Sequence, residues 1–331
     1  MIDLNFSKQI DPDTIPCQEK WQLDIVDFLK DWYSPSTTIT TKTSGSTGTP
    51  KNIKLTKKAM AESAKMTGTF LNLRANDRAL LCMPSSYIAG KMMLVRALVW
   101  KLHLYCIEPT SHPLENLNMI FTFSAMTPMQ VENSLEKLYL IKKLIVGGAQ
   151  PSFQLVSQLK NQSTDIYESF GMTETISHIA LKKISDHEEH PVFKLMPNTK
   201  IRVDERGCLC VLPPFLNEEI KTNDLISIIS ENEFEWKGRI DNVINSGGIK
   251  IFPEQVEKQL KSVIDSDFII SSIKDPLLGN KVVIIIAGKK DTDLEEKILD
   301  FNFDNKYEKP KEFIYVDSFA KTPTGKIIRK I

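Results

Sequence analysis

The chain has 331 residues, of which 41% are apolar and 25% are charged, and these values are ordinary for a globular protein of about two domains. Its 42 Lys and Arg side chains balance 42 Asp and Glu side chains, so the formal net charge is zero. Non-specific binding to nucleic acids and anionic membranes requires a basic excess. The balance therefore argues against a nucleic-acid partner, while it leaves room for a local basic site that binds phosphate.

The sequence also lacks the signals of export and membrane insertion. The first residues show no basic start followed by an apolar run, and the longest apolar stretch, at 282–287, is too short to span a bilayer. Five scattered cysteines lack the spacing of a disulfide framework or of a complete zinc site. We therefore expect a cytoplasmic protein with reduced thiols, in which the alternating Cys208 and Cys210 are packing residues.

Short apolar runs alternate with amphipathic stretches, which predicts mixed α and β structure. In chain order, we expect strands at 79–83, 120–123, 144–146, 201–203, 208–212, 225–229, 268–273, 282–287 and 313–316. We expect helices at 57–70, 91–101, 128–139, 153–160, 253–263 and 293–301. Thr127 with Gln130, and Thr292 with Glu295, have the spacing of capping boxes at the starts of two of these helices.

The character of the chain changes near Gly238. A Gly-Arg turn and a Gly-Gly turn precede a compact tail with a ββα-like pattern. We place the domain boundary there, with an N-terminal domain over residues 1–238 and a C-terminal domain over residues 239–331. The expected fold class is α/β: a large N-terminal α/β domain of mixed sheets with helices, followed by a small C-terminal α+β domain.

The strongest local signal is a run of glycine and hydroxyl residues that ends in a lysine: Thr43-Ser44-Gly45-Ser46-Thr47-Gly48-Thr49-Pro50-Lys51. Glycine lets the backbone approach an anion closely, and consecutive amides can form a nest for phosphate oxygens. The hydroxyls add neutral donors, and Lys51 adds a cation. A flexible surface linker is the alternative, but the β-branched lead-in at 38–40 and the apolar Ile53 and Leu55 favour an anchored phosphate loop.

The nucleotide-binding P-loop, Gly-x-x-x-x-Gly-Lys-Ser/Thr, is a second alternative for this segment. Counted from Gly45, Pro50 stands where the second glycine belongs, and Asn52 stands where the Ser or Thr belongs. No expected helix begins directly after Lys51 either. The spacing therefore argues against a P-loop phosphotransferase.

The loop resembles the phosphate loop of the adenylate-forming superfamily, which comprises acyl-CoA synthetases, adenylation domains of peptide synthetases and luciferases. Further segments resemble the motifs of this family in the same order, from about residue 43 to residue 331. The resemblance implies an enzyme that uses ATP and Mg²⁺ to form an acyl-adenylate and then transfers the acyl group to coenzyme A. It also implies that the small C-terminal domain is mobile.

The second segment is Ser169-Phe170-Gly171-Met172-Thr173-Glu174-Thr175. The resemblance implies that this segment, Gly171 included, lines the adenylate pocket, with Phe170 stacked on adenine. It further implies that Thr173 contacts phosphate and that Glu174 holds Mg²⁺, a metal that usually takes one or two carboxylates together with substrate phosphates. The turn Gly147-Gly148-Ala149 resembles the adenine-side turn of the family, and an ordinary β-turn is its alternative.

The third and fourth segments surround the expected domain boundary. Thr222-Asn223-Asp224-Leu225 resembles the Thr-Gly-Asp pattern of the family, with Asn223 in place of glycine, and implies that Asp224 accepts hydrogen bonds from both ribose hydroxyls. The segment 238–257 resembles the next motif of the family, and this resemblance implies that Arg239 reaches the ribose and that Asp241 is the hinge of the small domain. It also implies that the turn Gly247-Gly248 forms one wall of the pantetheine tunnel.

The last segment is Lys321-Thr322-Pro323-Thr324-Gly325-Lys326-Ile327-Ile328-Arg329, for which a solvated basic tail is the alternative. It resembles the catalytic-lysine loop of the family, which implies that Lys326 bridges the attacking carboxylate and the α-phosphate and stabilises charge in the transition state. The resemblance thus implies a catalytic set of Lys326, Glu174 and Lys51. Because Asp224 and Arg239 are intact as well, a catalytically silent relative is the weaker hypothesis.

The chain is short for this superfamily, because its phosphate loop begins at Thr43. As a compact form, the chain resembles the o-succinylbenzoate–CoA ligase family of menaquinone biosynthesis. The segments 86–97 and 173–181 carry this resemblance. Such a substrate is a dianion, whose free carboxylate needs charge or hydrogen-bond partners when it is buried. We hypothesise that Lys91, Ser177 and His178 supply these partners and that Tyr87 shapes the pocket.

Several alternatives stay open at this point. Lys91 is equally well explained as a solvent-facing helix lysine, and Phe121, Phe123 and Met126 either line the acyl pocket or belong to the core. Activation of another aryl or fatty acid, or loading of a carrier protein, is the alternative function. The expected partner is a small-molecule carboxylate, and the sequence does not indicate an oligomeric state.

Overall fold

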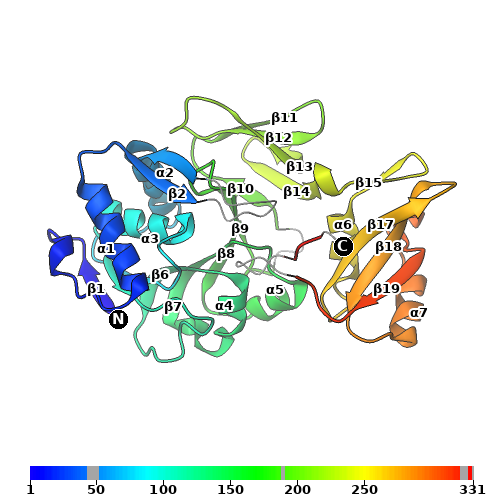
Figure 1. The fold of residues 1–331 in the computed structure, drawn as a ribbon, viewed down its shortest axis with the longest axis horizontal. Helices are drawn as coiled ribbons and strands as arrows, with labels where there is room; N and C mark the ends of the chain where they lie inside the picture. The colour runs from blue at the N-terminus through cyan, green and yellow to red at the C-terminus, as the bar shows by residue number, and fades with distance from the viewer. Residues whose placement is uncertain (43–51, 188–190, 321–326, 330–331) are drawn as a thin grey trace.

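The structure is a computed structural model that describes residues 1–42, 52–187, 191–320 and 327–329. Within these residues, one 12-stranded sheet runs through the larger part of the molecule, and the strands after Arg239 form smaller sheets (Figure 1). The strands of the large sheet are β1 (Ile2–Asn5), β4 (Arg78–Leu81), β5 (His103–Cys106), β6 (Phe121–Met126), β7 (Ile141–Val146), β8 (Asp165–Gly171), β9 (His178–Lys183), β10 (Phe193–Leu195), β11 (Lys200–Val203), β12 (Cys208–Leu212), β13 (Ile220–Ser230) and β14 (Glu233–Arg239).

The two halves of this sheet differ in strand direction. Strands β5, β4, β6, β7 and β8 lie side by side in that order and pair in parallel, with β1 antiparallel to β5 at the edge. Beyond β8 the order continues through β9, β10, β14, β13, β12 and β11, and these neighbours pair antiparallel. Parallel strands need long crossover connections, which are usually helices, whereas antiparallel strands can be joined by tight turns. The described α-helices that precede Arg239 accordingly all come before β8 in the chain.

Helices cover both faces of the parallel half. The helices of this region are η1 (Pro12–Thr14), α1 (Lys20–Tyr33), α2 (Lys57–Phe70), α3 (Ile88–Trp100), α4 (Pro128–Glu132), η2 (Leu135–Leu140) and α5 (Phe153–Leu159). Along β4, Ala79 and Leu81 join one core with α1, α2 and α3, whereas Leu80 joins a second core with α4 and α5. Successive side chains of a strand point to opposite faces, so burial on both faces explains the nearly continuous apolar runs of these strands.

The antiparallel half has its own core, built around three phenylalanines. Phe193 on β10 and Phe234 on β14 pair directly across the strands and stack with ring centroids 5.5 Å apart. Phe170 on β8 meets Phe234 edge-on, with centroids 5.3 Å apart. Cys208 and Cys210 on β12 are buried free thiols, so the interpretation as packing residues is confirmed.

The smaller sheets follow Arg239. Their elements are η3 (Ile240–Asn242), β15 (Ile244–Ser246), β16 (Ile249–Ile251), α6 (Pro253–Leu260), β17 (Phe268–Asp275), β18 (Gly279–Ala287), α7 (Thr292–Asp300), η4 (Lys306–Glu308) and β19 (Glu312–Val316). β15 and β16 form a hairpin, and β18 pairs antiparallel with β17 and parallel with β19. One face of this three-stranded sheet packs on α6 and α7, and the other face buries a smaller apolar cluster. Figure 1 shows this part of the chain beside the large sheet.

The expected fold class is confirmed: a mixed α/β protein with one large mixed sheet, flanking helices and a small strand-rich C-terminal part. Every expected strand and helix is present, although the helix expected at 128–139 is divided into α4 and the 3₁₀-helix η2. No helix among the described residues is long and apolar enough to cross a membrane.

The two expected capping boxes have different outcomes. Thr127 and Gln130 form the box at the start of α4, as the sequence predicts. The box expected for Thr292 and Glu295 is wrong, because Asp291 is the N-cap of α7 and its side chain accepts the amide N–H three residues further on. Asp and Thr are both good N-cap residues, so the local sequence alone did not decide between two adjacent candidates.

Phe234 should contribute strongly to stability, because it is fully buried between Phe170 and Phe193. We expect Phe234→Ala to lower the free energy of unfolding by about 3–5 kcal/mol, through lost burial and the cavity left behind. Urea unfolding followed by tryptophan fluorescence measures this change. Phe153→Ala is the matched control: Phe153 is 48% exposed, and its loss should change the free energy by about 0.5 kcal/mol or less. Equal effects of the two substitutions would contradict this packing.

Candidate active site

The carboxyl ends of the parallel strands meet at one edge of the large sheet, and several expected site residues follow these ends directly. Tyr87 lies in the segment between β4 and α3, the turn 147–149 follows β7, and Phe170 and Gly171 end β8. In open α/β sheets, ligands bind in the crevice outside the carboxyl ends of the strands. The strand direction therefore brings segments that are far apart in the sequence to one candidate active site.

The connection between β8 and β9 is a tightly held turn. The hydroxyl of Thr175 accepts a hydrogen bond from the backbone N–H of Met172 at 3.0 Å. It also lies 2.7 Å from the carbonyl oxygen of Ser177. Gly171 approaches β9 so closely that a Cβ atom would lie 2.4 Å from the same oxygen. Ile176 has a φ of 68° with its side chain buried in the core, and such a backbone is strained for a β-branched residue. A turn that is over-determined in this way holds its remaining side chains at fixed positions.

Thr173 and Glu174 lie within this turn. Thr173 is buried, whereas the side chain of Glu174 is exposed. In the described part of the chain, no group of three His, Cys, Asp or Glu side chains could hold a metal ion. A single exposed carboxylate still fits Mg²⁺, because this ion keeps several waters and is usually held by one or two carboxylates together with substrate phosphates.

Phe170 is held edge-on by its neighbours. Its ring makes T-shaped contacts with Phe193 at 5.5 Å and Phe234 at 5.3 Å, and its side chain is only half-buried. On the neighbouring strand end, a Cβ atom at Gly147 would lie 2.5 Å from the hydroxyl of Ser169. Gly148 has a φ of 88°, which favours glycine. The structure therefore places the expected adenine-side turn directly beside the strand end that carries Phe170.

Asp224, Arg239 and Asp241 form one charged cluster where the large sheet ends. Asp224 on β13 and Arg239 on β14 pair across the strands, and the Nη1 of Arg239 lies 3.8 Å from Oδ2 of Asp224. The Nη2 of Arg239 donates to Asp241 at 2.8 Å, and the indole N–H of Trp236 donates to Asp224 at 3.0 Å. An ionised carboxylate has about four lone-pair sites, so Asp224 retains acceptor capacity for hydroxyl groups.

The cluster also keeps Asp241 ionised. The hydrogen bond from Arg239 holds the pKa of the Asp241 carboxyl below its usual value, and a second donor, the side-chain amide of Asn223, acts in the same direction. That amide lies 3.1 Å from Asp241. Asn223, which departs from the glycine of the family pattern, thus contacts the residue expected to act as the hinge.

Arg96 is a functional candidate that the sequence did not reveal. It lies on α3, is only 3% exposed, and donates from Nη2 to the hydroxyl of Ser177 at 2.7 Å. Among the residues that the structure describes, Arg96 has no carboxylate partner, and its buried Nε has no hydrogen-bond partner. Burial lowers the pKa of Arg96 to about 9, so the guanidinium remains charged at neutral pH. A buried cation without a counter-charge is costly, which makes this group a candidate for binding an anionic ligand.

His178 adjoins Arg96 in the same network. Its Nε2 lies 3.1 Å from the hydroxyl of Thr67, and its Nδ1 lies 3.3 Å from the hydroxyl of Ser177. Burial, reinforced by the positive charge of Arg96, holds the pKa of His178 well below the ordinary value of 6.5. The imidazole is therefore neutral at physiological pH, so it can supply hydrogen bonds but no charge.

Lys91 is placed apart from Ser177 and His178, with which the sequence grouped it. Its ammonium lies over the ring of Phe28 on α1, 5.3 Å from the centroid. Burial lowers the pKa of Lys91, while Asp31 and Asp24 oppose the shift. The structure thus directs Lys91 toward α1 and brings Arg96 to the position that Lys91 was expected to occupy.

The remaining acyl-pocket candidates also have definite places. Tyr87 is the N-cap residue of α3 and is 41% exposed. Phe121, Phe123 and Met126 are fully buried and are divided between the cores on the two faces of the sheet. Of the two alternatives for these three residues, core packing is the one that the structure supports.

The Gly247-Gly248 turn joins β15 to β16. Its φ values of 57° and 82° suit a two-residue hairpin turn, which requires positive φ at both positions. The amide of Gly247 donates to the carbonyl of Leu278 at 2.9 Å, so the turn packs against the β17–β18 connection. In this arrangement the glycines adjoin their own part of the chain and not the β8–β9 turn.

Two expected segments lie outside the described residues. They are the phosphate loop, with Thr43, Ser44, Gly45, Ser46, Thr47, Gly48 and Lys51, and the loop that carries Lys326. The first is bounded by β2 (Thr38–Lys42) and β3 (Asn52–Thr56), which pair antiparallel along their whole length. The strands therefore anchor both ends of the phosphate loop, as the sequence predicts.

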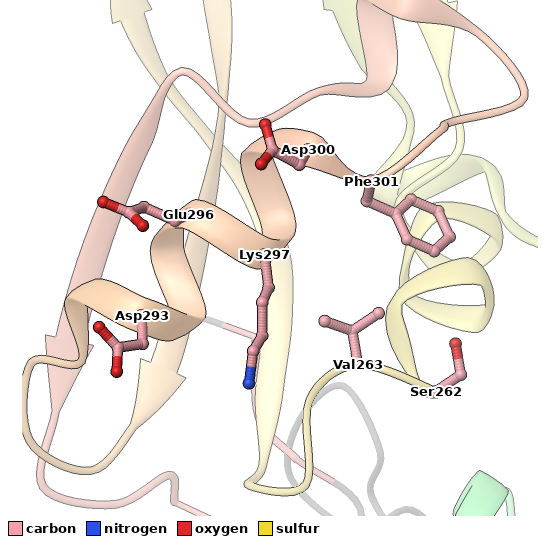
Figure 2. A pocket seen from close by; sticks show the side chains of 7 residues that line it. All are labelled: Ser262, Val263, Asp293, Glu296, Lys297, Asp300 and Phe301. Atoms are coloured by element: carbon pink, nitrogen blue, oxygen red, sulfur yellow. The ribbon is translucent and has the colours of Figure 1, made fainter.

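An open groove lies elsewhere, between α7 and the segment after α6 (Figure 2). Its volume is about 730 Å³, and it is lined by Ser262, Val263, Asp293, Glu296, Lys297, Asp300 and Phe301. Figure 2 shows Lys297 extending along the groove while the carboxylates point away from Val263 and Phe301. None of the expected site residues lines it, and its polar groups do not converge, so we do not assign the substrate site there.

Comparison with known proteins agrees with the fold and identifies the family. The structure aligns over 99% of its length with an acyl-CoA synthetase (AMP-forming)/AMP-acid ligase II-like protein from Dyadobacter fermentans, at 36% identity, 98% coverage of that chain and a TM-score of 0.69. The family model described as AMP-binding enzyme matches residues 36–214, more than half of the chain. The chain therefore belongs to the AMP-binding enzyme family, and the expected class, an AMP-forming acid–CoA ligase, is confirmed at the level of this family.

Two relatives are more specific. The 2-succinylbenzoate--CoA ligase of Staphylococcus epidermidis is 26% identical over 320 aligned residues, which cover 87% of this chain and 68% of the relative. The o-succinylbenzoate coenzyme A synthetase of Bacillus subtilis, solved in complex with ATP and magnesium ion, has a TM-score of 0.73 at 21% identity, over 88% of this chain and 68% of its own. The chain thus spans about two thirds of the length of these relatives.

The buried His178 makes the stability of the protein depend on pH. Its pKa is lowered in the folded state, so below pH 6.5 the unfolded chain binds a proton that the folded chain does not. We therefore expect the free energy of unfolding to fall as the pH drops from 7 to 5, by up to about 1.4 kcal/mol per pH unit for this one group. Urea unfolding at both pH values measures the slope. His178→Gln should reduce the slope, whereas His112→Gln, a change at an exposed histidine, should not. An unchanged slope in His178→Gln would contradict the assignment.

Proposed function

We propose that this protein ligates o-succinylbenzoate to coenzyme A through an acyl-adenylate, as a step of menaquinone biosynthesis. In the first step a carboxylate oxygen attacks the α-phosphorus of ATP, and the bond to pyrophosphate breaks. In the second step the thiol sulfur of coenzyme A attacks the acyl carbon, and AMP leaves with its phosphate oxygen. The names of the relatives support this substrate, and one observation in the structure supports it independently.

That observation is the buried guanidinium of Arg96, which has no carboxylate partner among the residues that the structure describes. The proposed substrate is a dianion, so one carboxylate reacts and the other must be stabilised inside the protein. A guanidinium with unused donors matches a carboxylate in geometry and charge. Arg96 is held by Ser177, which in turn contacts the neutral His178, so the network offers one positive charge and several hydrogen-bonding groups. A neutral fatty-acyl chain would leave this charge uncompensated.

The remaining site residues take the roles that the family resemblance implies. Phe170 supports the adenine, with the 147–149 turn beside it, and Asp224 and Arg239 bind the ribose. Thr173, Lys51 and the hydroxyls of the 43–48 loop bind the phosphates, and Lys326 stabilises charge at the α-phosphate in the first step. Mg²⁺, when bound at Glu174, neutralises phosphate charge and polarises the phosphoryl oxygens. The tightly held β8–β9 turn supports these roles, because preorganised donors need no rearrangement during the reaction.

We further propose that residues 1–238 and 239–331 are two domains that rotate relative to one another about Asp241. The rotation would exchange the Lys326 loop for the Gly247-Gly248 turn between the two steps. The packing of this turn against Leu278 supports the proposal, because the turn reaches the adenylate only if its whole domain turns. Domain rotation of this kind is an established way of assembling a second active site from one chain.

The proposed function is tested by measuring pyrophosphate release with ATP and Mg²⁺ against a panel of acids, followed by mass detection of the coenzyme A thioester. The panel contains o-succinylbenzoate, benzoate, 4-hydroxybenzoate, a medium-chain fatty acid and several amino acids. We expect turnover with o-succinylbenzoate alone, and its loss in Lys326→Ala. Turnover with a different acid would refute the substrate and keep the mechanism. If no acid of the panel causes pyrophosphate release, the proposal is refuted.

Arg96 should determine the affinity for the dianion. We expect Arg96→Met to lower kcat/KM for o-succinylbenzoate at least about 30-fold, the effect of losing about 2 kcal/mol from a buried charge pair. Lys91→Met is the matched control and should change kcat/KM less than about 3-fold, because Lys91 packs against Phe28 on α1 and forms no hydrogen bond or ion pair with Ser177 or His178. The affinity for ATP, measured by calorimetry, should stay unchanged in both variants. An equal loss in Lys91→Met would support the hypothesis that Lys91 binds the free carboxylate.

A further inference from the structure

A chain of hydrogen bonds leads from α2 to Arg96. Thr67 on α2 is only 1% exposed, and its hydroxyl donates to the carbonyl of Ser63 at 3.2 Å. The same hydroxyl lies 3.1 Å from Nε2 of His178, whose Nδ1 lies 3.3 Å from the hydroxyl of Ser177. Ser177 accepts the hydrogen bond from Nη2 of Arg96 at 2.7 Å. These contacts therefore join α2, the start of β9 and α3 in one network.

The bonding pattern fixes the direction of this chain. A hydroxyl has one proton, and Thr67 gives its proton to the carbonyl of Ser63, so it accepts from the Nε2–H of His178. A neutral imidazole donates at one ring nitrogen and accepts at the other, so Nδ1 accepts from the hydroxyl of Ser177. With the proton on Nδ1 instead, the Ser177 hydroxyl would have no acceptor among the described residues. We assign the Nε2–H tautomer to His178 for this reason.

α2 is fixed against α3, the helix that carries Arg96. The indole N–H of Trp100 on α3 donates to the carbonyl of Ala64 on α2 at 3.0 Å. A Cβ atom at Gly68 would lie 2.1 Å from the same indole ring, so glycine at this position lets the two helices approach closely. Ala64 and Gly68 lie on either side of Thr67 in the sequence, about one helical turn apart. The two contacts therefore hold the Thr67 hydroxyl in place relative to α3.

This network suits a ligand site better than a protein core. His178 is 8% exposed and Arg96 is 3% exposed, and polar groups in such positions are costly unless they are hydrogen-bonded. The chain gives each hydroxyl and each imidazole nitrogen a partner, yet Arg96 keeps a buried Nε that has none in the part of the protein that the structure describes. A fully bonded network rigidifies its members. A guanidinium that is already held in one orientation loses less side-chain freedom when it binds a carboxylate, so it binds more tightly.

We propose that Thr67 is a positioning residue that, through His178 and Ser177, orients the guanidinium which binds the free carboxylate of the acid substrate. The inference rests on the proposed function, in which Arg96 binds this carboxylate. Thr67 acts through other side chains, on the acid and not on the nucleotide. Its loss should therefore raise the KM for the acid and leave kcat and the KM for ATP nearly unchanged.

The kinetic test measures pyrophosphate release with o-succinylbenzoate. We expect Thr67→Val, which removes the hydroxyl and keeps the shape of the side chain, to raise the KM for the acid about 10-fold, because one hydrogen bond of a buried network is lost. kcat and the KM for ATP should change less than about 3-fold. Thr67→Ser keeps the hydroxyl and should hold the KM for the acid within about 2-fold of the wild-type value. An unchanged KM for the acid in Thr67→Val, or an equal rise in the KM for ATP, would overturn the inference.

Thr164→Val is the matched control. Thr164 is 2% exposed, and its hydroxyl donates to the carbonyl of Leu138 at 2.8 Å, so this change also removes a buried threonine hydroxyl that is bonded to a backbone carbonyl. Thr164 precedes β8, at the opposite end of that strand from Phe170. We expect both KM values to change less than about 2-fold. A rise in the KM for the acid equal to that of Thr67→Val would show a general effect of lost stability and overturn the inference.

NMR of the protein labelled with ¹⁵N in histidine measures the tautomer directly, because protonated and unprotonated imidazole nitrogens resonate far apart. His178→Gln assigns the signals of His178 among the five histidines. We expect the proton on Nε2 in the wild type and on Nδ1 in Thr67→Val, where Nε2–H would lack its acceptor. An unchanged tautomer in Thr67→Val would show a purely structural role of Thr67 and overturn the inference. A proton on Nδ1 in the wild type would reverse the chain of hydrogen bonds and overturn it as well.

A double-mutant cycle makes the test specific to Arg96. In an Arg96→Met background, Thr67→Val should raise the KM for the acid less than about 2-fold further, because residues that act as a unit are not additive. A further rise of about 10-fold would show that Thr67 acts by another route and would overturn the inference. If Arg96→Met itself leaves the KM for the acid unchanged, the proposed function loses its carboxylate-binding residue, and the inference falls with it. A silent Thr67→Val beside an effective Arg96→Met overturns the inference alone.

Discussion

The site depends on one constraint, the parallel hydrogen-bond ladder that joins β4, β6, β7 and β8. Because these strands run in the same direction, the turns that follow them emerge at one edge, and this places the 147–149 turn beside Phe170. The ladder ends at β8, where β9 reverses direction. The reversal brings Ser177 and His178 to Arg96 on α3, so the proposed nucleotide side and the proposed acyl side of the site are joined by a turn of a few residues.

Two arginines, Arg96 and Arg329, show how charge is used differently in the two parts of the molecule. Arg96 is buried without a counter-charge among the described residues, which suits a place where a ligand brings the charge. The side chain of Arg329 is 26% exposed and has Glu257 and a backbone carbonyl as partners, so its charge is compensated within the protein. The uncompensated burial of Arg96 carries a desolvation penalty, so it is better explained by function than by stability.

The junction between the large sheet and the C-terminal part is also charged. Arg239 ends β14 and contacts Asp224 within the large sheet and Asp241 beyond it. A single guanidinium thus connects the expected ribose site with the expected hinge. If the C-terminal part turns about Asp241, the contact to Asp241 changes while the strand pairing of Asp224 with Arg239 remains, so nucleotide binding and rotation share one residue.

The sequence by itself determined the features that depend on near neighbours: the apolar runs of the strands, the cap at Thr127, the Gly247-Gly248 turn and the motif order that identified the family. The tertiary structure decided which side chains meet. β8 and β9 were not predicted as strands, because their pattern mixes apolar residues with charges that only pairing partners bury. Lys91 and Arg96 lie on one helix about 140° apart, since each residue turns the helix by about 100°. Periodicity could not tell which of these cations faces the site, because the packing of α3 between α1 and the β8–β9 turn decides it.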